Sequence, residues 1–417
     1  MIYSSWRPVS PKPELWPQCS GKKDETLKVM TQWVGFAVFF SVVTSLYGGA
    51  HYYLYSWFVR VAEPPQKQRQ ILLYLFLYLV ASFPVSKILG WHDFNALIYL
   101  LTFIASVWMG LAFYFFLLAL GSDLIINLFK MIRLKPKVFA KRSLFYNRLL
   151  VASIAGSVFI IGGLALREAR DLGVTRLEIP LRGLPPELDG FSIVQISDVH
   201  YGMLTRNKEL SSLVERVNDL QPDIVVITGD LVDESVSHME EMKVPLSRLK
   251  SRHGILAITG NHEYYAGVDR AVAIMKGVNI RVLRNAVKIL PGGLQILGID
   301  DPTGYRRMGE AEPDFDRLVS GLDRQRPSIL LYHQPILFAK AASLGIGLQL
   351  SGHTHGGQLF PIRYISKMIY PFTPGLHQSG DSYLYVSWGA GTWGPPMRLK
   401  AFPELVYIRL RALPRPL

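Results

Sequence analysis

Cysteine is almost absent from this chain of 417 residues, in which Cys19 is the only one. A single cysteine excludes an intrachain disulfide and excludes a metal site built from several thiolates. Any metal centre must therefore use imidazole, carboxylate or amide ligands. The first 30 residues are polar and rich in proline and lysine. We therefore expect no cleavable signal sequence there.

Acidic residues are scarce in the first half of the chain. Residues 1–176 hold 19 Lys and Arg against 8 Asp and Glu, whereas residues 177–417 hold 26 against 24. The formal charge of +13 therefore belongs to the first half, and the second half is nearly neutral. A nucleic-acid-binding domain would carry its positive charge as a patch on a folded surface. We expect no nucleic-acid partner.

Long apolar runs separated by short basic loops fill residues 31–170, after a polar N-terminal segment of residues 1–30. This pattern predicts a membrane domain with about four transmembrane helices, since roughly 20 apolar residues span a bilayer. The expected spans are Trp33–Trp57, Ile71–Leu89, Asn95–Leu120 and Leu149–Leu166. We expect Asp123–Leu134 to form a separate amphipathic helix in the interface.

Basic residues in the loops predict the orientation of the chain. Residues 130–148 contain seven Lys or Arg and no acid, so this loop should be cytoplasmic. One further span then places the second half on the outer face of the inner (cell) membrane. The basic N-terminal segment argues for the opposite orientation. We predict an integral membrane protein whose second half is extracytoplasmic.

Few ionisable groups lie inside the expected spans. His51 and Lys87 are the only basic side chains well inside them, and Lys87 is expected near an interface. A transporter usually carries more intramembrane charge. We therefore predict that the membrane domain is an anchor.

From about residue 175, short β-branched runs alternate with helical segments, as in an α/β fold. The expected strands are Phe191–Ile196, Asp223–Thr228, Ile255–Thr259, Leu294–Ile299, Ser328–Tyr332, Leu348–Leu350 and Tyr383–Ser387. Residues 207–218 have helical periodicity, and the tail Glu404–Leu410 can pair at a sheet edge. Such folds place their functional residues where strands end.

Side chains that bind divalent metals follow most of these runs. They occur in Ser197-Asp198-Val199-His200, Gly229-Asp230, Gly260-Asn261-His262-Glu263, His333 and Gly352-His353-Thr354-His355. Asp198 and His200 would point the same way in an extended segment. Each block alone is a weak signal, because Asp-x-His is common in turns and a single histidine is ordinarily a core residue. All five in order at strand ends predict a two-metal hydrolytic site.

On these residues the second half resembles a calcineurin-like metallophosphoesterase of the membrane-attached bacterial branch. The stretches that carry the resemblance are Ile196–Gly202, Asp223–Asp233, Ser351–Gln358 and Tyr385–Gly391 with Pro403-Glu404. The resemblance implies an α/β domain over residues 175–412, folded as a two-sheet metallophosphoesterase sandwich flanked by helices. This domain would follow the α-helical transmembrane domain.

The resemblance also implies two divalent metal ions, Mn, Fe or Zn, and a role for each motif residue. One ion would be held by Asp198, His200 and His355. The second would be held by Asn261, His333 and His353, with Asp230 bridging the two. His262 would contact the phosphoryl group and protonate the leaving group, because the pKa of histidine suits proton transfer near neutrality.

One departure from the superfamily bears on the substrate. Protein serine/threonine phosphatases carry an arginine directly after Gly-Asp-x-x-Asp, whereas here Glu234 follows Asp233. This disfavours a phosphoprotein and favours small or lipid-linked phosphoesters. Asp233 itself is expected either to support the metal ligands or to lie on the surface.

The stretch Leu359–Phe372 is apolar except for Arg363 and Lys367, and it follows the last metal-ligand motif. Such a segment can dip into lipid headgroups and admit a lipid phosphoester. The alternative is ordinary packing against the sandwich. Trp388 and Trp393 would belong either to the same rim or to the core.

We therefore predict a membrane-anchored dinuclear-metal phosphohydrolase that uses a metal-activated water. A phosphomonoester, a phosphodiester or a pyrophosphate fits the site, and a lipid-linked substrate is a hypothesis. A narrower alternative is a nucleotide-sugar lipid pyrophosphatase of the UDP-diacylglucosamine type, whose substrate is cytoplasmic. An alternative of another class is a catalytically silent membrane receptor or scaffold, which has no physical need for the full ligand set.

Overall fold

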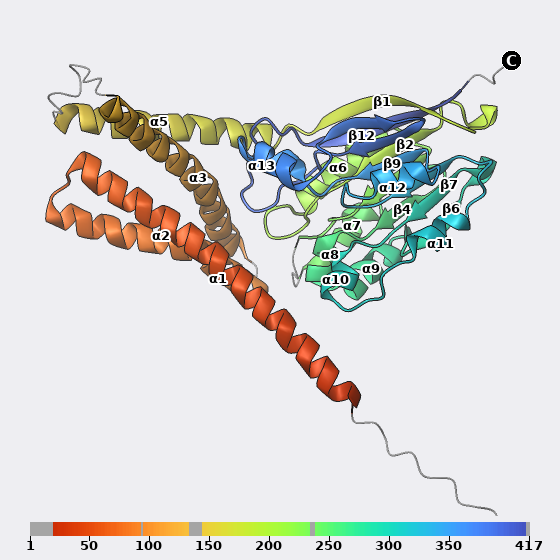
Figure 1. Ribbon diagram of the computed structural model, residues 1–417, viewed down its shortest axis with the longest axis horizontal. Coiled ribbons are helices and arrows are strands. Elements are labelled where there is room, and N and C mark those ends of the chain that lie inside the picture. The colour runs from red at the N-terminus through yellow and green to blue at the C-terminus, as the bar shows by residue number, and fades with distance from the viewer. Residues whose placement is uncertain (1–19, 93–94, 133–143, 234–237, 414–417) are drawn as a thin grey trace, which may run out of the picture. The chain divides into compact units, whose positions relative to one another are not determined.

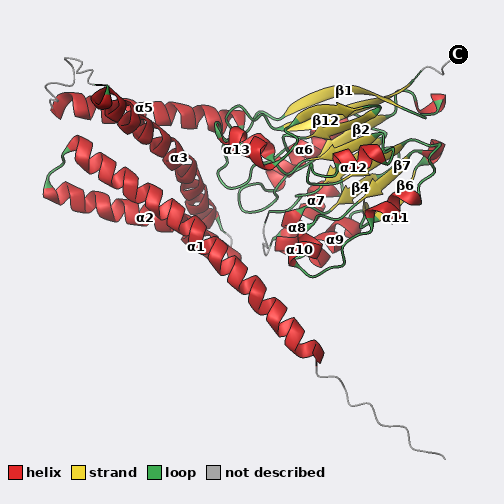
Figure 2. Ribbon diagram, viewed as in Figure 1, coloured by secondary structure: helices red, strands yellow, loops and turns green. Residues whose placement is uncertain are grey.

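The structure, a computed structural model, describes residues 20–92, 95–132, 144–233 and 238–413, with the backbone alone for 20–40 and 91–92. The chain divides into two compact units, residues 1–49 and 50–417. Figure 1 labels the helices and strands, and Figure 2 distinguishes helical from strand segments. Glu234 and Lys141, together with the other residues between these ranges, lie outside the description.

The first part of the described chain is helical. Its helices are α1 (Ser20–Ala62), α2 (Gln66–His92), α3 (Ala96–Met131) and α5 (Leu144–Glu168). Within the described residues, three helical segments are long and apolar enough to cross a membrane, namely Gln66–Gly90, Ala96–Met131 and Leu144–Glu168. The expected first span, Trp33–Trp57, lies within α1, whose side chains before residue 41 lie outside the description. A fourth span therefore stays a prediction.

Helix α3 is continuous, so the prediction of a separate interfacial helix at Asp123–Leu134 is wrong. The reason lies in the partners that α1 supplies. Asp123 accepts a hydrogen bond from Tyr53 at 2.9 Å and an ion pair from Arg60. Trp57 donates from Nε1 to the Ser122 hydroxyl at 3.2 Å. With its polar groups satisfied, the helix has no need to break at this point.

Two six-stranded sheets form the second half (Figure 2). The first has the order β1 (Gly173–Leu181), β12 (Glu404–Ala412), β2 (Ser192–Ile196), β3 (Ile224–Thr228), β4 (Ile255–Ile258), β5 (Ile280–Val282). The second has the order β10 (Gly375–Ser379), β11 (Ser382–Val386), β9 (Leu348–Ser351), β8 (Ser328–Leu331), β7 (Gln295–Gly298), β6 (Ala286–Ile289). This confirms the predicted fold class of apolar helices followed by a two-sheet α/β sandwich.

The C-terminal strand is not at a sheet edge, contrary to the prediction for Glu404–Leu410. Strand β12 pairs parallel with β1 and antiparallel with β2, so β1 occupies the edge. Leu405, Ile408 and Leu410 of β12 are fully buried. A strand buried on both sides belongs in the sheet interior, and its place at the end of the sequence does not determine its place in the sheet.

Buried aliphatic side chains fill the space between the sheets. Ile193, Ile224 and Leu256 of the first sheet belong to one cluster with Ile296 and Ile329 of the second. Helices α6 (Asn207–Asp219), α7 (Lys243–Leu246) and α9 (Val268–Gly277) cover the outer face of the first sheet. Helices α11 (Phe315–Ser320) and α12 (Phe338–Ser343) pack on the second. Helix α6 occurs where residues 207–218 predicted a helix.

The parallel strands position the polar motifs. Strands β2, β3 and β4 run parallel, as do β7, β8, β9 and β11. Each motif residue follows the end of one of these strands, and three short helices lie in the same connections: α8 (Asn261–Ala266), α10 (Thr303–Arg307) and α13 (Ile362–Ile369). The carboxyl ends of both sheets therefore deliver the motif residues to one region.

Candidate metal centre and active site

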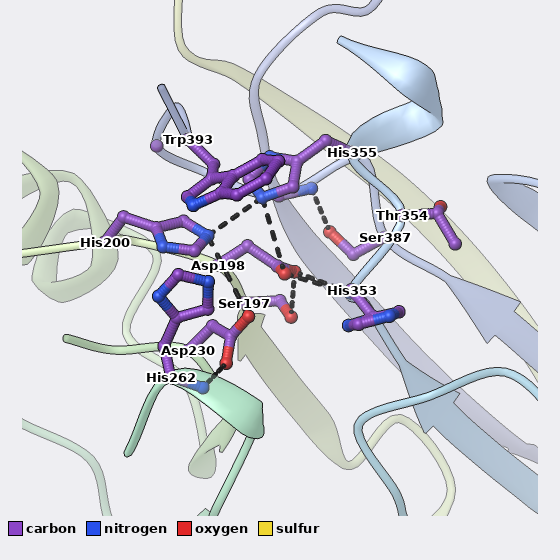
Figure 3. Close-up of polar contacts among 12 residues, drawn as sticks. Ser197, Asp198, His200, Asp230, His262, His353, Thr354, His355, Ser387 and Trp393 are labelled. Carbon is purple, nitrogen blue, oxygen red and sulfur yellow. Dashed lines mark hydrogen bonds and ion pairs between the residues drawn. The ribbon is translucent and has the colours of Figure 1, made fainter. Parts of the chain in front are cut away.

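Six of the seven predicted metal ligands form two groups. The ligand atoms of Asp198, His200 and His355 lie within 4.8 Å of one another. Those of Asp230, His333 and His353 also lie within 4.8 Å of one another. Figure 3 shows the side chains of His200, Asp198, Asp230 and His355 directed toward a common space.

Asp230 lies between the two groups. Its Oδ2 is 3.0 Å from Nε2 of His333 and 3.9 Å from Nε2 of His200. Burial alone would raise the pKa of Asp230, but the positive charge of His333, with that of His262, holds this pKa well below the usual range. Asp230 is thus a buried anion within reach of both groups, as a bridging ligand must be.

The donor atoms of the site fit divalent cations. The Nε2 atoms of His200 and His355 face each other at 2.9 Å, and both rings are buried. Burial, reinforced by the charge of His200, lowers the pKa of His355 well below its usual value. Asn261, the seventh predicted ligand, is buried, and its Oδ1 has no hydrogen-bond partner among the described residues. A metal ion is the kind of partner that such converging lone pairs accept.

Five of the predicted ligands adopt a left-handed backbone. Their φ angles are 54° for Asp198, 53° for His200, 50° for Asp230, 74° for His353 and 47° for His355. The expectation that Asp198 and His200 point the same way because their segment is extended is therefore wrong in its geometry. Backbone in this region is sparsely populated by non-glycine residues and concentrates at functional sites.

Glycines let the motif loops approach one another closely. A Cβ atom on Gly229 would lie 2.6 Å from Nδ1 of His333 and 2.8 Å from Cα of Gly260, and Gly229 has a φ of 92°. A Cβ atom on Gly260 would collide with the carboxylate of Asp230. A side chain at either position would push the β3 and β4 loops apart and displace Asp230.

His262 is held by Asp233 and by the loop of Asp230. Its Nδ1 lies 2.5 Å from the carbonyl oxygen of Asp233 and 3.3 Å from Oδ1 of that residue. Its backbone N–H donates to Oδ1 of Asp230 at 2.9 Å. Burial opposes a charge on His262, but the carboxylates of Asp230 and Asp233 raise its pKa to about 9. With Nδ1 directed at Asp233, Nε2 is the ring atom left for a substrate.

Two aromatic side chains flank His262 at the surface. The ring of Tyr265 lies 5.4 Å from the His262 ring, and that of Trp393 lies 6.1 Å from it. Trp393 was expected either at the rim of the site or in the core. Its side chain is 56% exposed, so it lies at the rim. Trp388 instead packs close to Gly356, and its backbone N–H donates to Glu404 at 3.0 Å.

Asp233 also belongs to the site. Its Oδ1 lies 3.5 Å from Nδ1 of His200 as well as 3.3 Å from Nδ1 of His262. Asp233, His200 and His262 form a third group whose ligand atoms lie within 4.8 Å of one another. Asp233 lies beside the far nitrogen of His200 without a hydrogen bond between them, while Nε2 of His200 faces His355. This placement agrees with the first of its two expected positions.

Sequence reasoning missed several residues of the site. Asp301 follows β7 and is fully buried, and it accepts hydrogen bonds from Gln334 and from the N–H of Thr303, both at 2.9 Å. The signal for Asp301 was available, because an acid follows a buried strand there as at Asp198. Arg398 had no local signal, since its Nη2 lies 3.0 Å from Nδ1 of His355, 43 positions away.

Comparisons with known proteins show the family to which the chain belongs. The family described as Calcineurin-like phosphoesterase matches residues 191–357. A metallophosphoesterase of Campylobacter jejuni is 30% identical over 90% of this chain and 99% of its own length. A metallophosphoesterase of Helicobacter pylori J99 is 39% identical over 52% of this chain and 59% of its own length.

One of the similar proteins is named as a transmembrane protein. A transmembrane protein with metallophosphoesterase domain from Bos taurus is 35% identical over 63% of this chain and 62% of its own length. The chain thus spans about three fifths of the Helicobacter and Bos taurus relatives and nearly all of the Campylobacter one.

Proposed function

Because this chain belongs to the calcineurin-like metallophosphoesterase family, we propose that it is a membrane-anchored phosphohydrolase that cleaves a phosphoester with two divalent metal ions. The observation that carries this proposal is Asp230, a buried carboxylate within 3.9 Å of histidines from both ligand groups. A scaffold protein has no need for a buried anion placed between two sets of imidazoles.

Each predicted residue has a role in this proposal. Asp198, His200 and His355 would hold one ion, Asn261, His333 and His353 would hold the other, and Asp230 lies within reach of both groups. When bound there, ions of Mn, Fe or Zn would supply Lewis-acid chemistry, that is, activation of water and stabilisation of charge on phosphoryl oxygens. His262 donates a proton from Nε2 to the departing oxygen. The carboxylates of Asp230 and Asp233 raise its pKa to about 9, which favours the protonated ring that this role needs.

Helix α13 supports a lipid-linked substrate. All of its residues are at least partly exposed, and its outward apolar side chains include Ile365, Met368 and Ile369, with Met368 87% exposed. Arg363 and Lys367 lie on the same short helix. Helices that lie in a lipid interface have an exposed apolar face with Lys or Arg side chains beside it, as α13 does.

Both ends of α13 support the same idea. Leu359 and Ile362, at its start, pack in one hydrophobic cluster with Leu111 and Val158 of the apolar helices α3 and α5. Tyr370, directly after its end, lies 2.6 Å from Nε2 of the predicted metal ligand His353. The helix therefore connects an apolar region that can enter the bilayer with the site where phosphorus would react.

The first test uses the full-length protein in detergent with p-nitrophenyl phosphate and bis-p-nitrophenyl phosphate. Turnover is compared with Mn, Fe and Zn, and Asp230→Asn is the control variant. We expect metal-dependent hydrolysis that Asp230→Asn abolishes, and the better substrate then separates monoesterase from diesterase. Bound metal without turnover of any phosphoester, lipid esters included, would favour the receptor or scaffold alternative.

The lipid part of the proposal has its own test. Phosphatidic acid and UDP-diacylglucosamine in mixed micelles are compared with water-soluble glycerol phosphate. The double variant Met368→Glu, Ile369→Glu should lower lipid turnover about tenfold or more while p-nitrophenyl turnover stays within about twofold. Val244→Glu, at an exposed apolar residue of α7, is the matched control. Equal turnover of soluble and lipid esters, with no effect of the α13 variant, would contradict a lipid substrate.

We also propose that the catalytic domain is extracytoplasmic in the inner membrane. The basic loop of residues 130–148 supports this orientation. Protease accessibility on spheroplasts tests it directly. Protection of the catalytic domain would instead favour the cytoplasmic nucleotide-sugar lipid as substrate.

A further inference from the structure

Lys87 is a largely buried cation in an apolar helix. It lies in the segment Gln66–Gly90, one of the three that can span a membrane, and its side chain is only 16% exposed. A lysine in such a segment is costly unless its ammonium group is paired or reaches water, and intramembrane charges commonly mark functional sites. Its partner is therefore informative.

The ammonium group of Lys87 faces the predicted active site. Its Nζ lies 3.5 Å from Oδ2 of Asp233, whose side chain is 14% exposed. The other carboxylate oxygen of Asp233 faces Nδ1 of His200 at 3.5 Å and Nδ1 of His262 at 3.3 Å. One carboxylate thus lies within ion-pair distance of Lys87, of the predicted metal ligand His200 and of the predicted proton donor His262, whose Nδ1 is also hydrogen-bonded to the Asp233 carbonyl oxygen.

A second contact of the same helix supports this placement. A Cβ atom on Gly90 would lie 2.7 Å from Sδ of Met203, so α2 packs directly against the loop that follows His200. Lys87 and Gly90 are three residues apart and lie on one face of α2. A Cβ atom on Gly202, the neighbour of Met203, would in turn lie 2.9 Å from Cβ of Asp233. The Lys87 ion pair belongs to a packed interface.

We propose that Lys87 is a positioning residue that fixes the carboxylate of Asp233 and, through it, the rings of His200 and His262, so that α2 completes the active site. This inference rests on the proposed phosphohydrolase function. His200 needs a fixed orientation because a group beside its far ring nitrogen determines where the ligating nitrogen points. His262 needs one because its Nε2 must face the departing oxygen. Without the ammonium group of Lys87, the Asp233 carboxylate can adopt other orientations. The imidazole rings of His200 and His262, which lie against it, then become less well ordered.

The test uses full-length variants in detergent and two measurements, the Mn affinity and the separate kcat and KM for bis-p-nitrophenyl phosphate. Lys87→Met should weaken Mn binding and lower kcat, each by about tenfold, with little change in KM. Lys87→Arg should recover most of both losses because it keeps the positive charge. Lys67→Met, an exposed lysine of the same helix, is the matched control and should leave both unchanged.

A double variant distinguishes positioning through Asp233 from general destabilisation. Asp233→Asn alone should cost about 10–100-fold in Mn affinity or kcat. Adding Lys87→Met to it should cost almost nothing more, because the group through which Lys87 acts has already been changed. Losses that multiply in the double variant would overturn the proposal. So would a Lys87→Met variant with wild-type Mn affinity and kcat.

The contact itself is testable without catalysis. In a Cys19→Ser background, a short bis-maleimide reagent should cross-link Gly90→Cys to Met203→Cys and should leave Lys67→Cys with Met203→Cys unlinked, because a Cβ atom at Gly90 would touch the end of the Met203 side chain. Failure of the first pair to cross-link would overturn the proposal. If the wild type hydrolyses no phosphoester, the proposed function fails, whereas Mn affinity and cross-linking still decide the role of Lys87.

Discussion

The buried carboxylate of Glu263 holds in place the backbone of Asp230 and of the two residues that follow it. Its Oε2 accepts hydrogen bonds from the N–H of Asp230 at 2.9 Å and of Gly260 at 2.6 Å. Its Oε1 accepts from the N–H of Leu231 at 2.8 Å and of Val232 at 3.2 Å. Glu263 is fully buried, so it ties the β3 loop to the β4 loop at the proposed bridging ligand.

Glu263→Gln should destabilise the fold and weaken metal binding together. A glutamine presents an NH2 group where one carboxylate oxygen accepts, so buried N–H donors lose their acceptor. We expect a loss of about 3 kcal/mol in the free energy of unfolding. Both the lost hydrogen bonds to a charged carboxylate and the backbone donors left without an acceptor contribute to this loss. Chemical unfolding in detergent measures the loss, and Mn titration measures the effect on the site.

Glu209→Gln is the matched control for this prediction. Glu209 also occupies the third position of its helix, α6, and accepts one hydrogen bond, at 3.1 Å, from the N–H of Arg206. It is exposed, so water replaces the lost contact and the change should be within about 0.5 kcal/mol. Equal effects of the two substitutions would show that Glu263 does not hold the Asp230 loop.

The variant His262→Asn should lower kcat in a way that depends on the leaving group. A proton donor contributes about 10²–10⁴-fold when the departing oxygen needs a proton. The loss should be largest for an alkyl ester and smaller for a p-nitrophenyl ester, whose leaving group departs readily as an anion. Mn content should stay unchanged because His262 is not a proposed ligand.

His253→Asn controls for this variant, since His253 is exposed and stacks on Phe191 away from the ligand groups. A uniform loss for all leaving groups would refute the role of His262 as proton donor. Loss of bound Mn would instead assign His262 to the metal centre, where it forms a group with His200 and Asp233.

The sequence predicted the eight inner strands and the gathering of the motif residues, because both depend on local patterns, but it missed the edge strands β1, β5, β6 and β10. Runs such as Ile224–Thr228 are apolar and β-branched, and a run of that kind is a strand buried on both faces. Parallel strands then carry Asp198, Asp230 and Asn261 to one end of the sheet. The identity of these residues as metal ligands stays a prediction that metal titration must test.

Long-range contacts decided what the sequence could not predict. Asp198 and His200 have positive φ angles, although we expected an extended segment there. Gly352 and Gly391, from distant parts of the chain, pack so closely on this segment that a Cβ atom on either would collide with it. Lys87 looked like an interfacial lysine because nothing near it in the sequence pointed to Asp233, 146 positions away. Packing between distant segments leaves no periodic signal.

Removal of metal should destabilise the catalytic domain. The site buries Asp198 and Asp230 among four predicted histidine ligands, and bound cations offset the mutual repulsion of its like charges. A ligand that binds only the native state adds about 2.7 kcal/mol at 100 times its Kd. We expect EDTA to lower the Tm of the wild type and Mn to restore it. Asp230→Asn should lose most of this response, and an equal response in that variant would place the stabilising metal elsewhere.

Acid should weaken the link between β2 and β3 at Asp223. Its Oδ2 accepts from the N–H and the hydroxyl of Ser192, both at 2.8 Å, and its Oδ1 accepts from Arg252 at 2.9 Å. Burial opposes the charge, but these hydrogen bonds hold the pKa of Asp223 below its usual value. A carboxyl whose folded pKa is depressed stabilises the fold above its unfolded pKa of about 3.9, and the stabilisation is lost as the pH falls through the folded pKa.

The variant Asp223→Asn should therefore lower the free energy of unfolding by about 1 kcal/mol at pH 7, with the difference from wild type shrinking below about pH 4. Asp219→Asn, at an exposed residue of α6, should show no difference at either pH. Thermal unfolding in detergent at a series of pH values measures both. A difference that persists unchanged at the lowest pH would mean that the charge of Asp223 contributes nothing and that Asn disrupts packing instead. In that case the contacts of Ser192 and Arg252 with Asp223 would not require that its carboxyl group be ionised.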